Sequence, residues 1–304
     1  MSLIGRMYQA FIKTSAPPAK KGLEVDLRTR LSVARMYARS YEWARTQAGL
    51  FGEVRDYVMF LGHARSGGTL TGALLDAHPN AIIGDEVDVV QYVNAGFERD
   101  QIFHILLERS QRQAKKGHVK AGRDQKQYSY YVPNAWQGRH DRLLVIGNRK
   151  AGISTQRIGS DPQALERLQK LLGNIRLKFI LSVRNPYDTI STMSIRSGRE
   201  LASGVSQYFA NCATIQDVRD TVSPQNLLVL RHEDLLNAPD GHLRQMCQFL
   251  DIPAVENYLS ACRAILFQSP ATSRTKVKWE TEMIKKVRAE IEKFSFLEGY
   301  SYES

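Results

Sequence analysis

The sequence has 304 residues, of which 43% are hydrophobic, and its formal net charge at pH 7 is +11. A chain of this kind can bury a substantial core in one or two domains, and its charge suits an acidic ligand. No stretch approaches the ~20 uninterrupted apolar residues of a membrane-spanning helix, so we expect none. The three cysteines and seven histidines have no metal-ligand spacing. We therefore expect reduced, buried thiols and no metal site.

The first fifty residues are basic, and six of their apolar residues recur at helical spacing. They are Leu3, Ile4, Met7, Tyr8, Phe11 and Ile12. A short amphipathic helix of this kind can lie on a membrane surface, although packing against the domain or a partner subunit is the commoner use. We expect residues 1–51 to form a basic helical extension. No signal peptide is evident, so we expect a cytoplasmic protein, at the inner membrane surface if this helix binds lipid.

An apolar strand, expected at Tyr57–Leu61, runs into a glycine-rich loop that opens a helix. In such a loop the backbone N–H groups of Ser66–Thr69 converge, and the helix dipole adds roughly half a positive charge. The loop therefore predicts an anion site that suits a phosphate-bearing ligand. It nearly matches the ATP-binding pattern G-x-x-x-x-G-K-[ST], but Gly68 stands at the lysine position and the positive charge is at Arg65. An ordinary ATPase or GTPase is therefore disfavoured.

The next two strands are expected at Ala81–Ile83 and Leu143–Ile146. Two acidic residues, Asp85 and Glu86, follow the first of them. One interpretation is that they take part in chemistry. The alternative is that they cap the next helix, where early acidic residues are common.

A fourth strand is expected at Leu177–Val183, an apolar run followed by Arg184. Asn185 can cap the next helix and Pro186 suits its first position, so residues 188–197 should be helical. Arg184 then emerges at the carboxyl end of a buried parallel strand, where ligands bind in open sheets. A guanidinium in this place, paired with a hydroxyl from the helix, makes a sound phosphate clamp.

A fifth strand is expected at Asn226–Leu230, and helical patterns separate all five strands. Such alternation predicts a parallel sheet with helices on both faces. Two basic groups remain, each either a solvated face or a platform for an anion. One comprises Arg109, Arg112, Lys115, Lys116, Lys120, Arg123 and Lys126, and the other lies in the loop Ser269–Trp279 and the helix after it.

Four of these segments, in this order and spacing, resemble sulfotransferases that use 3′-phosphoadenosine 5′-phosphosulfate (PAPS), nearest in motif to the tyrosylprotein and carbohydrate branches. The segments are Arg65-Ser-Gly-Gly-Thr-Leu70, Leu75-Asp-Ala-His-Pro79, Gly84-Asp-Glu86 and Leu177–Thr192. The resemblance implies a P-loop NTPase-like three-layer α/β fold with a central parallel sheet flanked by helices. Residues 52–304 are then a sulfotransferase domain. Gly68 replaces a threonine that is usual in the family, which removes a hydroxyl contact and keeps the backbone amides.

The resemblance also implies which residues bind the cofactor PAPS and its product, 3′-phosphoadenosine 5′-phosphate (PAP). The 5′-phosphosulfate would be bound by Arg65, Ser66, Gly67, Gly68, Thr69 and Leu70. The 3′-phosphate would be held by Arg184 and by Thr192, with Ser191 as a substitute. A loop that closes over the nucleotide would add Arg274 or Lys276.

For catalysis, the resemblance implies that Glu86 is the base, with Asp85 as the fallback. Arg65 would stabilise the leaving phosphate, and Arg149 or Lys150 would contact the sulfuryl group. No metal is required in this scheme, because the loop cations can serve in place of magnesium.

The sequence thus predicts transfer of a sulfuryl group to a hydroxyl, more of a carbohydrate or glycolipid than of a tyrosine. Four aromatic residues between the strands, which stack on a sugar or serve in packing, are Tyr128, Tyr130, Tyr131 and Trp136. One alternative is a nucleotide-dependent kinase with a degenerate loop. Another is a basic nucleic-acid-binding module, which leaves the loop and Arg184 unexplained, so we expect no nucleic acid partner.

Overall fold

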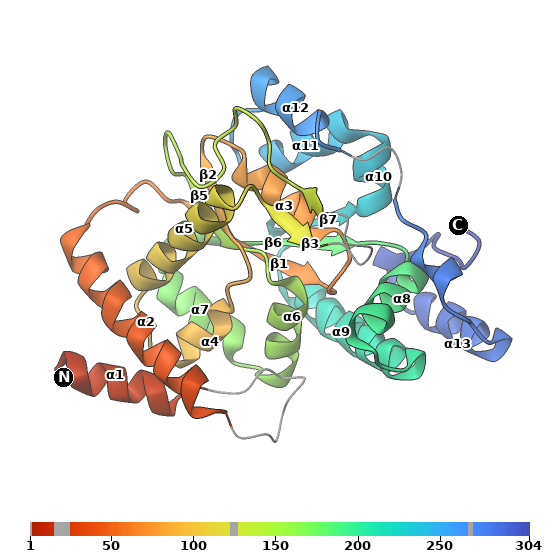
Figure 1. Ribbon diagram of the computed structural model, residues 1–304, viewed down its shortest axis with the longest axis horizontal. Coiled ribbons are helices and arrows are strands. Elements are labelled where there is room, and N and C mark those ends of the chain that lie inside the picture. Colours follow the sequence, from red (N-terminus) through yellow and green to blue (C-terminus); the bar gives the residue numbers. More distant parts are fainter. Residues whose placement is uncertain (1, 15–24, 122–126, 267–269) are drawn as a thin grey trace.

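The computed structural model describes residues 2–14, 25–121, 127–266 and 270–304 of the chain. Arg123, Lys126 and Ser269 lie outside the described residues, as do the side chains of Lys120 and Tyr128. Within the described part, a five-stranded sheet forms the centre and helices pack on both of its faces (Figure 1). The predicted three-layer α/β fold is therefore confirmed.

The sheet has the order β2-β5-β1-β6-β7, and every neighbouring pair of strands runs parallel. Its strands are β1 (Asp56–Gly62), β2 (Ala81–Gly84), β5 (Val145–Asn148), β6 (Arg176–Val183) and β7 (Leu227–Arg231). Four of the five predicted strands lie within one residue of these bounds. The strand predicted at Leu143–Ile146 begins two residues later, because the N–H of Leu144 bonds to the loop residue Asn80 and pairing with β1 starts at Val145.

The order of the strands explains where a ligand can bind. After β1 the chain continues to β2 on one side of it, and it later returns to β6 on the other side. The carboxyl ends of β1 and β6 therefore flank the point where the connections diverge, which is the usual binding crevice of an open parallel sheet.

Alternate residues of β1 face two hydrophobic cores, since side chains alternate along a strand. Tyr57, Met59 and Leu61 belong to the larger core, whereas Val58 and Phe60 belong to the smaller one. Helices of the larger core include α4 (Val89–Asn94), α5 (Arg99–Lys115), α6 (Ala151–Ser160), α7 (Ala164–Leu172), α8 (Pro186–Ser197), α9 (Leu201–Thr221) and α13 (Thr281–Ile291). The smaller core includes α3 (Gly68–Asp76), α10 (His232–Asn237), α11 (Pro239–Phe249) and α12 (Glu256–Arg263).

Two N-terminal helices, α1 (Leu3–Ile12) and α2 (Leu27–Thr46), pack on the larger core. The side-chain amide of Gln101 in α5 donates to the carbonyl of Tyr37 and the hydroxyl of Ser40 in α2, at 3.0 and 3.1 Å. The helix predicted from the apolar spacing is therefore present, while the domain boundary at residue 51 stays a prediction. None of the described helices is long and apolar enough to cross a membrane.

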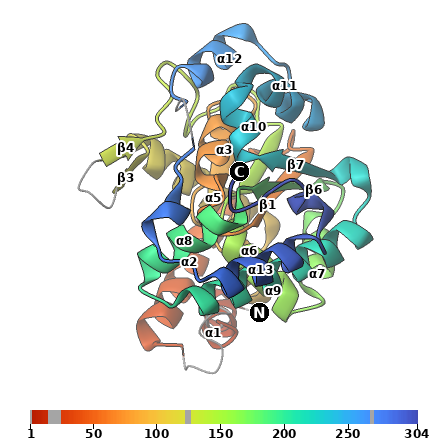
Figure 2. The same ribbon diagram turned by 90° about the vertical axis from the view of Figure 1, so that its right-hand side faces the viewer.

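Segments from distant parts of the sequence meet near the carboxyl ends of β1 and β6. The loop before α13, which contains the 3₁₀ turn Ser273–Lys276, packs against α8. Residues 301–304 also return to α8, where the side-chain amide of Asn185 donates to the carbonyls of Ser301 and Ser304 at 2.9 and 3.1 Å. A short antiparallel hairpin, β3 (Val119–Ala121) and β4 (Gln127–Ser129), projects from the body of the domain (Figure 2).

Candidate active site

The predicted phosphate loop follows β1 and leads directly into α3. Arg65 and Gly67 both adopt left-handed backbone conformations, with φ angles of 73° and 93°. Gly67 cannot carry a side chain, because a Cβ there would lie 2.5 Å from the Nδ1 of His232. The hydroxyl of Ser66 turns inward and donates to the carbonyl of His63 at 2.9 Å. The hydroxyl of Ser66 therefore holds the loop in shape, which leaves only its backbone N–H for an anion.

The amides of this loop are available to an anion. Among the described residues, no protein acceptor pairs with the backbone N–H groups of residues 66–69, and the residues after them bond back to the carbonyl of Gly67. These are the orphan amides that begin every helix, and they carry the positive end of its dipole. Two side chains lie beside these amides. That of Arg65 is exposed, and that of Thr69 is half-exposed.

Arg184 lies against the phosphate loop, as predicted. The residue is only 8% exposed, and its guanidinium donates to the carbonyl of Arg65 at 3.2 Å and to the carbonyl of Ala271. Burial lowers the pKa of Arg184, and the guanidinium remains charged because its ordinary pKa is so high. A buried cation is thus held next to the loop amides.

Three buried polar atoms around this loop have no hydrogen-bond partner in the described part of the chain. They are Nε of Arg184, Oγ of Ser182 and Nδ1 of His232. Ser182 lies near the end of β6, 3.7 Å from where a Cβ of Gly68 would stand. Burial lowers the pKa of His232 to about 4, so its imidazole is neutral at pH 7. Native proteins rarely leave buried polar atoms unpaired, which indicates that a polar ligand completes this site.

The two hydroxyls predicted for the 3′-phosphate lie in different environments. Ser191 is fully buried and accepts a hydrogen bond of 3.0 Å from the indole of Trp279. Thr192 is half-buried, and its hydroxyl donates to the carbonyl of Asp188 at 2.8 Å. Of the two alternatives, Thr192 is therefore the accessible one. Asn185 caps α8 and Pro186 takes its first position, both as expected.

The basic loop closes onto the same place through Arg274. This residue is 9% exposed and forms an ion pair of 2.6 Å with Asp188, which also accepts its backbone N–H. Arg274 thus fastens the loop to α8, whereas Lys276 is exposed. The prediction that either residue grips the phosphate stays untested, and the observed role of Arg274 is to hold the loop in place.

Glu86 lies in the turn after β2, at the same edge of the sheet as the phosphate loop. It is exposed and has a left-handed φ of 55°. Helix capping is done by Asp88, whose carboxylate accepts the N–H of Gln91 at 3.2 Å. The alternative that Asp85 or Glu86 caps the next helix is therefore wrong.

Asp85 and Arg149 form a buried ion pair of 2.5 Å. The contact places the charge of Asp85 beside Arg149, one of the two residues predicted to contact a sulfuryl group, and Nη1 of Arg149 has no hydrogen-bond partner among the described residues. Lys150 is half-exposed at the start of α6 and is the more accessible of the two. The exposed Glu86 is likewise better placed than the buried Asp85 to act as a base.

Sequence reasoning missed His232 and Ser182 as parts of the site. A signal for His232 was present, because it directly follows β7 within Leu230-Arg-His-Glu-Asp234. The position of Tyr130 was also not foreseen. Its phenol interacts electrostatically with Arg184, which brings the segment after β4 close to the phosphate loop.

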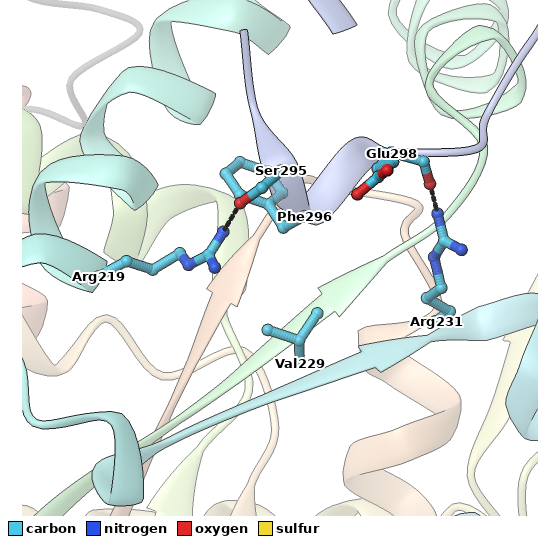
Figure 3. Close-up of a pocket in the computed structure, with 6 residues that line it drawn as sticks. All are labelled: Arg219, Val229, Arg231, Ser295, Phe296 and Glu298. Atoms are coloured by element: carbon cyan, nitrogen blue, oxygen red, sulfur yellow. Dashed lines mark hydrogen bonds between the residues drawn. The ribbon is translucent and has the colours of Figure 1, made fainter. Parts of the chain in front are cut away.

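A pocket of about 350 Å³ lies beside the edge strand β7, and none of the predicted site residues lines it (Figure 3). Arg219 donates to the hydroxyl of Ser295, and Arg231 donates to the carbonyl of Glu298. Each of these arginines therefore has a partner within the wall of the pocket.

The model of the sulfotransferase family matches residues 58–257, more than half of the chain. The chain belongs to the sulfotransferase family. Protein-tyrosine sulfotransferase A of Caenorhabditis elegans is 25% identical over 209 residues, which are 65% of this chain and 50% of that protein. The chain thus spans about half the length of this curated relative.

A solved mycobacterial structure agrees in fold with this family membership. Sulfotransferase STF9 from Mycobacterium avium has a TM-score of 0.52 at 11% identity, covering 96% of each chain. The sulfotransferase domain of the Synechococcus PCC 7002 olefin synthase has a TM-score of 0.46 at 19% identity, covering 78% of this chain and 89% of that chain. The fold shared with STF9 and the family match confirm the predicted P-loop NTPase-like fold and the predicted family, and the kinase and nucleic-acid-binding hypotheses are set aside.

Acidification is expected to destabilise this member of the family through buried histidines. Burial lowers the pKa of His63 to about 3 and that of His104 and of His232 to about 4. In the unfolded chain these groups titrate near 6.5, so unfolding takes up protons below that pH. Their contribution to the free energy of unfolding is complete above pH 6.5 and is lost as the pH falls toward 3. Asp76 acts in the opposite direction, because burial raises its pKa to about 7.

The variant His63→Phe tests this sign. It keeps a ring on Tyr208, whose centroid lies 3.7 Å from that of His63. The free energy of unfolding is measured by urea titration between pH 6.5 and pH 4. As the pH is lowered, we expect it to fall less steeply in the variant than in the wild type. The difference in slope should be about 1.4 kcal/mol per pH unit, which corresponds to one proton. Equal slopes in variant and wild type would contradict the assignment.

Proposed function

We propose that the chain transfers the sulfuryl group of PAPS to a hydroxyl of an acceptor. The observation that supports this most is the set of unpaired polar atoms around the phosphate loop. The buried Arg184, Ser182 and His232 each lie against the loop that carries the free amides. Donors of this kind suit phosphate oxygens, and a neutral imidazole can also accept a hydrogen bond.

Each part of the donor has candidate ligands in this proposal. PAPS supplies the activated sulfuryl group when it is bound. Its 5′ end would be held by Arg65, Thr69 and the amides of the phosphate loop. Its 3′-phosphate would be held by Arg184 and Thr192. No metal is invoked, because the loop amides and the two arginines supply the positive charge.

Glu86 would take the proton of the acceptor hydroxyl. It is exposed at the same sheet edge as the loop, so an acceptor can reach both. Lys150, half-exposed at the start of α6, would contact the sulfuryl oxygens. Arg65 and the helix dipole would stabilise the charge that develops on the departing phosphate.

We propose a carbohydrate or glycolipid as the acceptor. The segment after β4 supports this proposal. Tyr131 is 45% exposed, and its neighbour Tyr130 interacts electrostatically with Arg184. An exposed aromatic ring beside the donor site can stack on a sugar. The competing acceptor is a tyrosyl peptide, which the name of the relative from Caenorhabditis elegans favours.

The donor and the acceptor are tested in separate steps. Calorimetry should find PAP binding that ATP with magnesium does not displace, and absence of PAP binding would overturn the proposal. Transfer of labelled sulfate from PAPS is then compared between a panel of glycans and glycolipids and a panel of tyrosyl peptides. Label only in the peptides would replace the carbohydrate proposal and leave the donor proposal intact.

A substitution in the loop gives a gain-of-binding test. A Cβ at Gly68 would meet nothing closer than the Ser182 hydroxyl at 3.7 Å, so Gly68→Thr fits and restores the hydroxyl that the family usually has. One added hydrogen bond contributes about 0.5–1.5 kcal/mol, which predicts PAP binding roughly 2- to 10-fold tighter in calorimetry. Gly67→Ala is the matched control, and it should lose binding because its Cβ would collide with His232. Weaker binding by Gly68→Thr would contradict this fit.

We also propose that the protein is cytoplasmic and that α1 and the start of α2 contact an anionic membrane surface, which would locate it at the inner membrane. Ten large hydrophobic side chains are exposed in the described part of the chain, and six of them lie on these two helices. They are Leu3, Ile4, Tyr8, Ile12, Leu27 and Leu31. Exposed basic residues accompany them, among them Lys13, Arg28 and Arg35. Apolar side chains flanked by cations suit a lipid interface.

Vesicle co-sedimentation tests this contact. We expect binding to vesicles of phosphatidylglycerol and phosphatidylcholine, and at least 10-fold less binding by Ile4→Ser/Tyr8→Ser. Val255→Ser, which changes an exposed apolar residue elsewhere, is the matched control. No sedimentation of the wild type would overturn the proposal, and a dimer in light scattering that the double variant abolishes would assign the face to a second copy instead.

A further inference from the structure

The turn that carries Glu86 is held on both sides by residues of β5 and α6. Before it, the carbonyl of Gly84 accepts the backbone N–H of Arg149 at 3.2 Å. After it, the carbonyl of Val87 accepts the side-chain amide of Asn148 at 3.2 Å, and Asp88 accepts two hydrogen bonds of 2.8 and 2.9 Å from Arg157. Glu86 is therefore an exposed residue in a turn that hydrogen bonds hold on both sides.

The Asp85–Arg149 ion pair is the buried part of this anchor. The two side chains are only 9% and 2% exposed, and their charged atoms are 2.5 Å apart. An intact buried ion pair adds little net stability, because desolvation offsets most of the attraction. Removal of one partner leaves the other charge buried and alone, which favours rearrangement of the turn.

The path of Arg149 explains an otherwise unexpected glycine. Gly72 lies in the interior of α3, where glycine costs about 1 kcal/mol relative to alanine. A Cβ at Gly72 would be 2.2 Å from Cδ of Arg149 and 3.1 Å from its Cβ. The glycine therefore lets Arg149 pass close across the helix whose first turn forms the phosphate loop.

We propose that Asp85 and Arg149 are positioning residues, which fix the turn of Glu86 against α3 through the gap at Gly72. The pair links the helix of the phosphate loop to the residue that receives the acceptor proton. This inference rests on the proposed function of Glu86. The anchoring of the turn is a separate structural claim that can be measured without activity.

Hydrogen exchange and kinetics together test the pair in the full chain. In Asp85→Asn and in Gly72→Ala, we expect the amides of residues 85–87 to exchange at least 10-fold faster than in the wild type. We expect kcat to fall 10- to 100-fold while the dissociation constant of PAP changes less than 3-fold. Gly241→Ala is the matched control, because a Cβ at this helical glycine meets nothing within 4 Å.

Two variants of Arg149 separate positioning from general damage to the fold. Arg149→Lys keeps a cation for Asp85 and should retain kcat within 10-fold, whereas Arg149→Met should lose at least 100-fold. Unchanged exchange in Asp85→Asn and Gly72→Ala overturns the proposal, as does a loss of kcat that PAP affinity follows by the same factor. If the wild type does not bind PAP, the proposed function fails, and the exchange rates alone decide whether the pair anchors the turn.

Discussion

Arg184→Ala is expected to weaken PAP binding by at least about 100-fold. The residue is 8% exposed, and its guanidinium lies against the carbonyl of Arg65. Hydrogen bonds to charged groups contribute about 1.5–3 kcal/mol each, and a fork of two bonds to one phosphate is the usual geometry. Loss of about 2.7 kcal/mol corresponds to 100-fold in a dissociation constant. Calorimetric titration with PAP at fixed ionic strength measures this dissociation constant.

Two further variants interpret this result. Arg199→Ala removes the same charge from an exposed position just beyond α8, and it should leave PAP affinity within twofold. Arg184→Lys keeps the charge without the fork and should be intermediate, because lysine acts as a point charge. Thermal unfolding of each variant excludes loss of the fold. A folded Arg184→Ala that binds PAP like the wild type would remove the clamp from the proposal.

Glu86→Gln is expected to lower kcat by about 10²- to 10⁴-fold, the usual contribution of a general base. The amide keeps the shape of the side chain and cannot accept the proton. The affinity for PAP should stay within twofold of the wild-type value. The reason is that Glu86 is exposed and is proposed to contact the acceptor rather than the nucleotide. Steady-state kinetics with the acceptor found in the transfer screen, together with PAP calorimetry, measure both quantities.

Glu282→Gln is the matched control for the base. Glu282 is exposed on α13 and pairs with Lys285 at 2.8 Å, away from the predicted site residues. Its substitution should leave kcat unchanged. If Glu86→Gln retained full turnover with PAP affinity intact, Glu86 would not be the base, whatever Asp85→Asn does.

Local sequence signals predicted the backbone of the site well. The apolar run before Gly62 specifies β1, the glycines after it specify the turn into α3, and Pro186 specifies the start of α8. Strand bounds were least accurate at β5, where the apolar run extends into the preceding loop. Parallel strands then bring Arg65, Glu86 and Arg184 to one edge of the sheet, because all five carboxyl ends point the same way.

Side-chain partners were not predictable in the same way. Ser191 and Thr192 are neighbours in sequence, and only the packing of Trp279 assigns Ser191 to the core. Arg274 and Lys276 are equally basic, yet only Arg274 meets Asp188. The partners of these side chains depend on which distant segment packs next to each residue, and no local sequence pattern specifies that packing.

From the sequence alone we could predict the phosphate loop, the sheet that carries it and a phosphate-bearing ligand, because these follow from short-range periodicity, glycine placement and helix-end chemistry. Only the tertiary structure decided which polar atoms are left unpaired around the loop, that Asp85 meets Arg149 across Gly72, and that His232 lies against Gly67. These features arise from contacts between residues 64 to 165 positions apart. Close packing of the whole chain, rather than any local preference, fixes them.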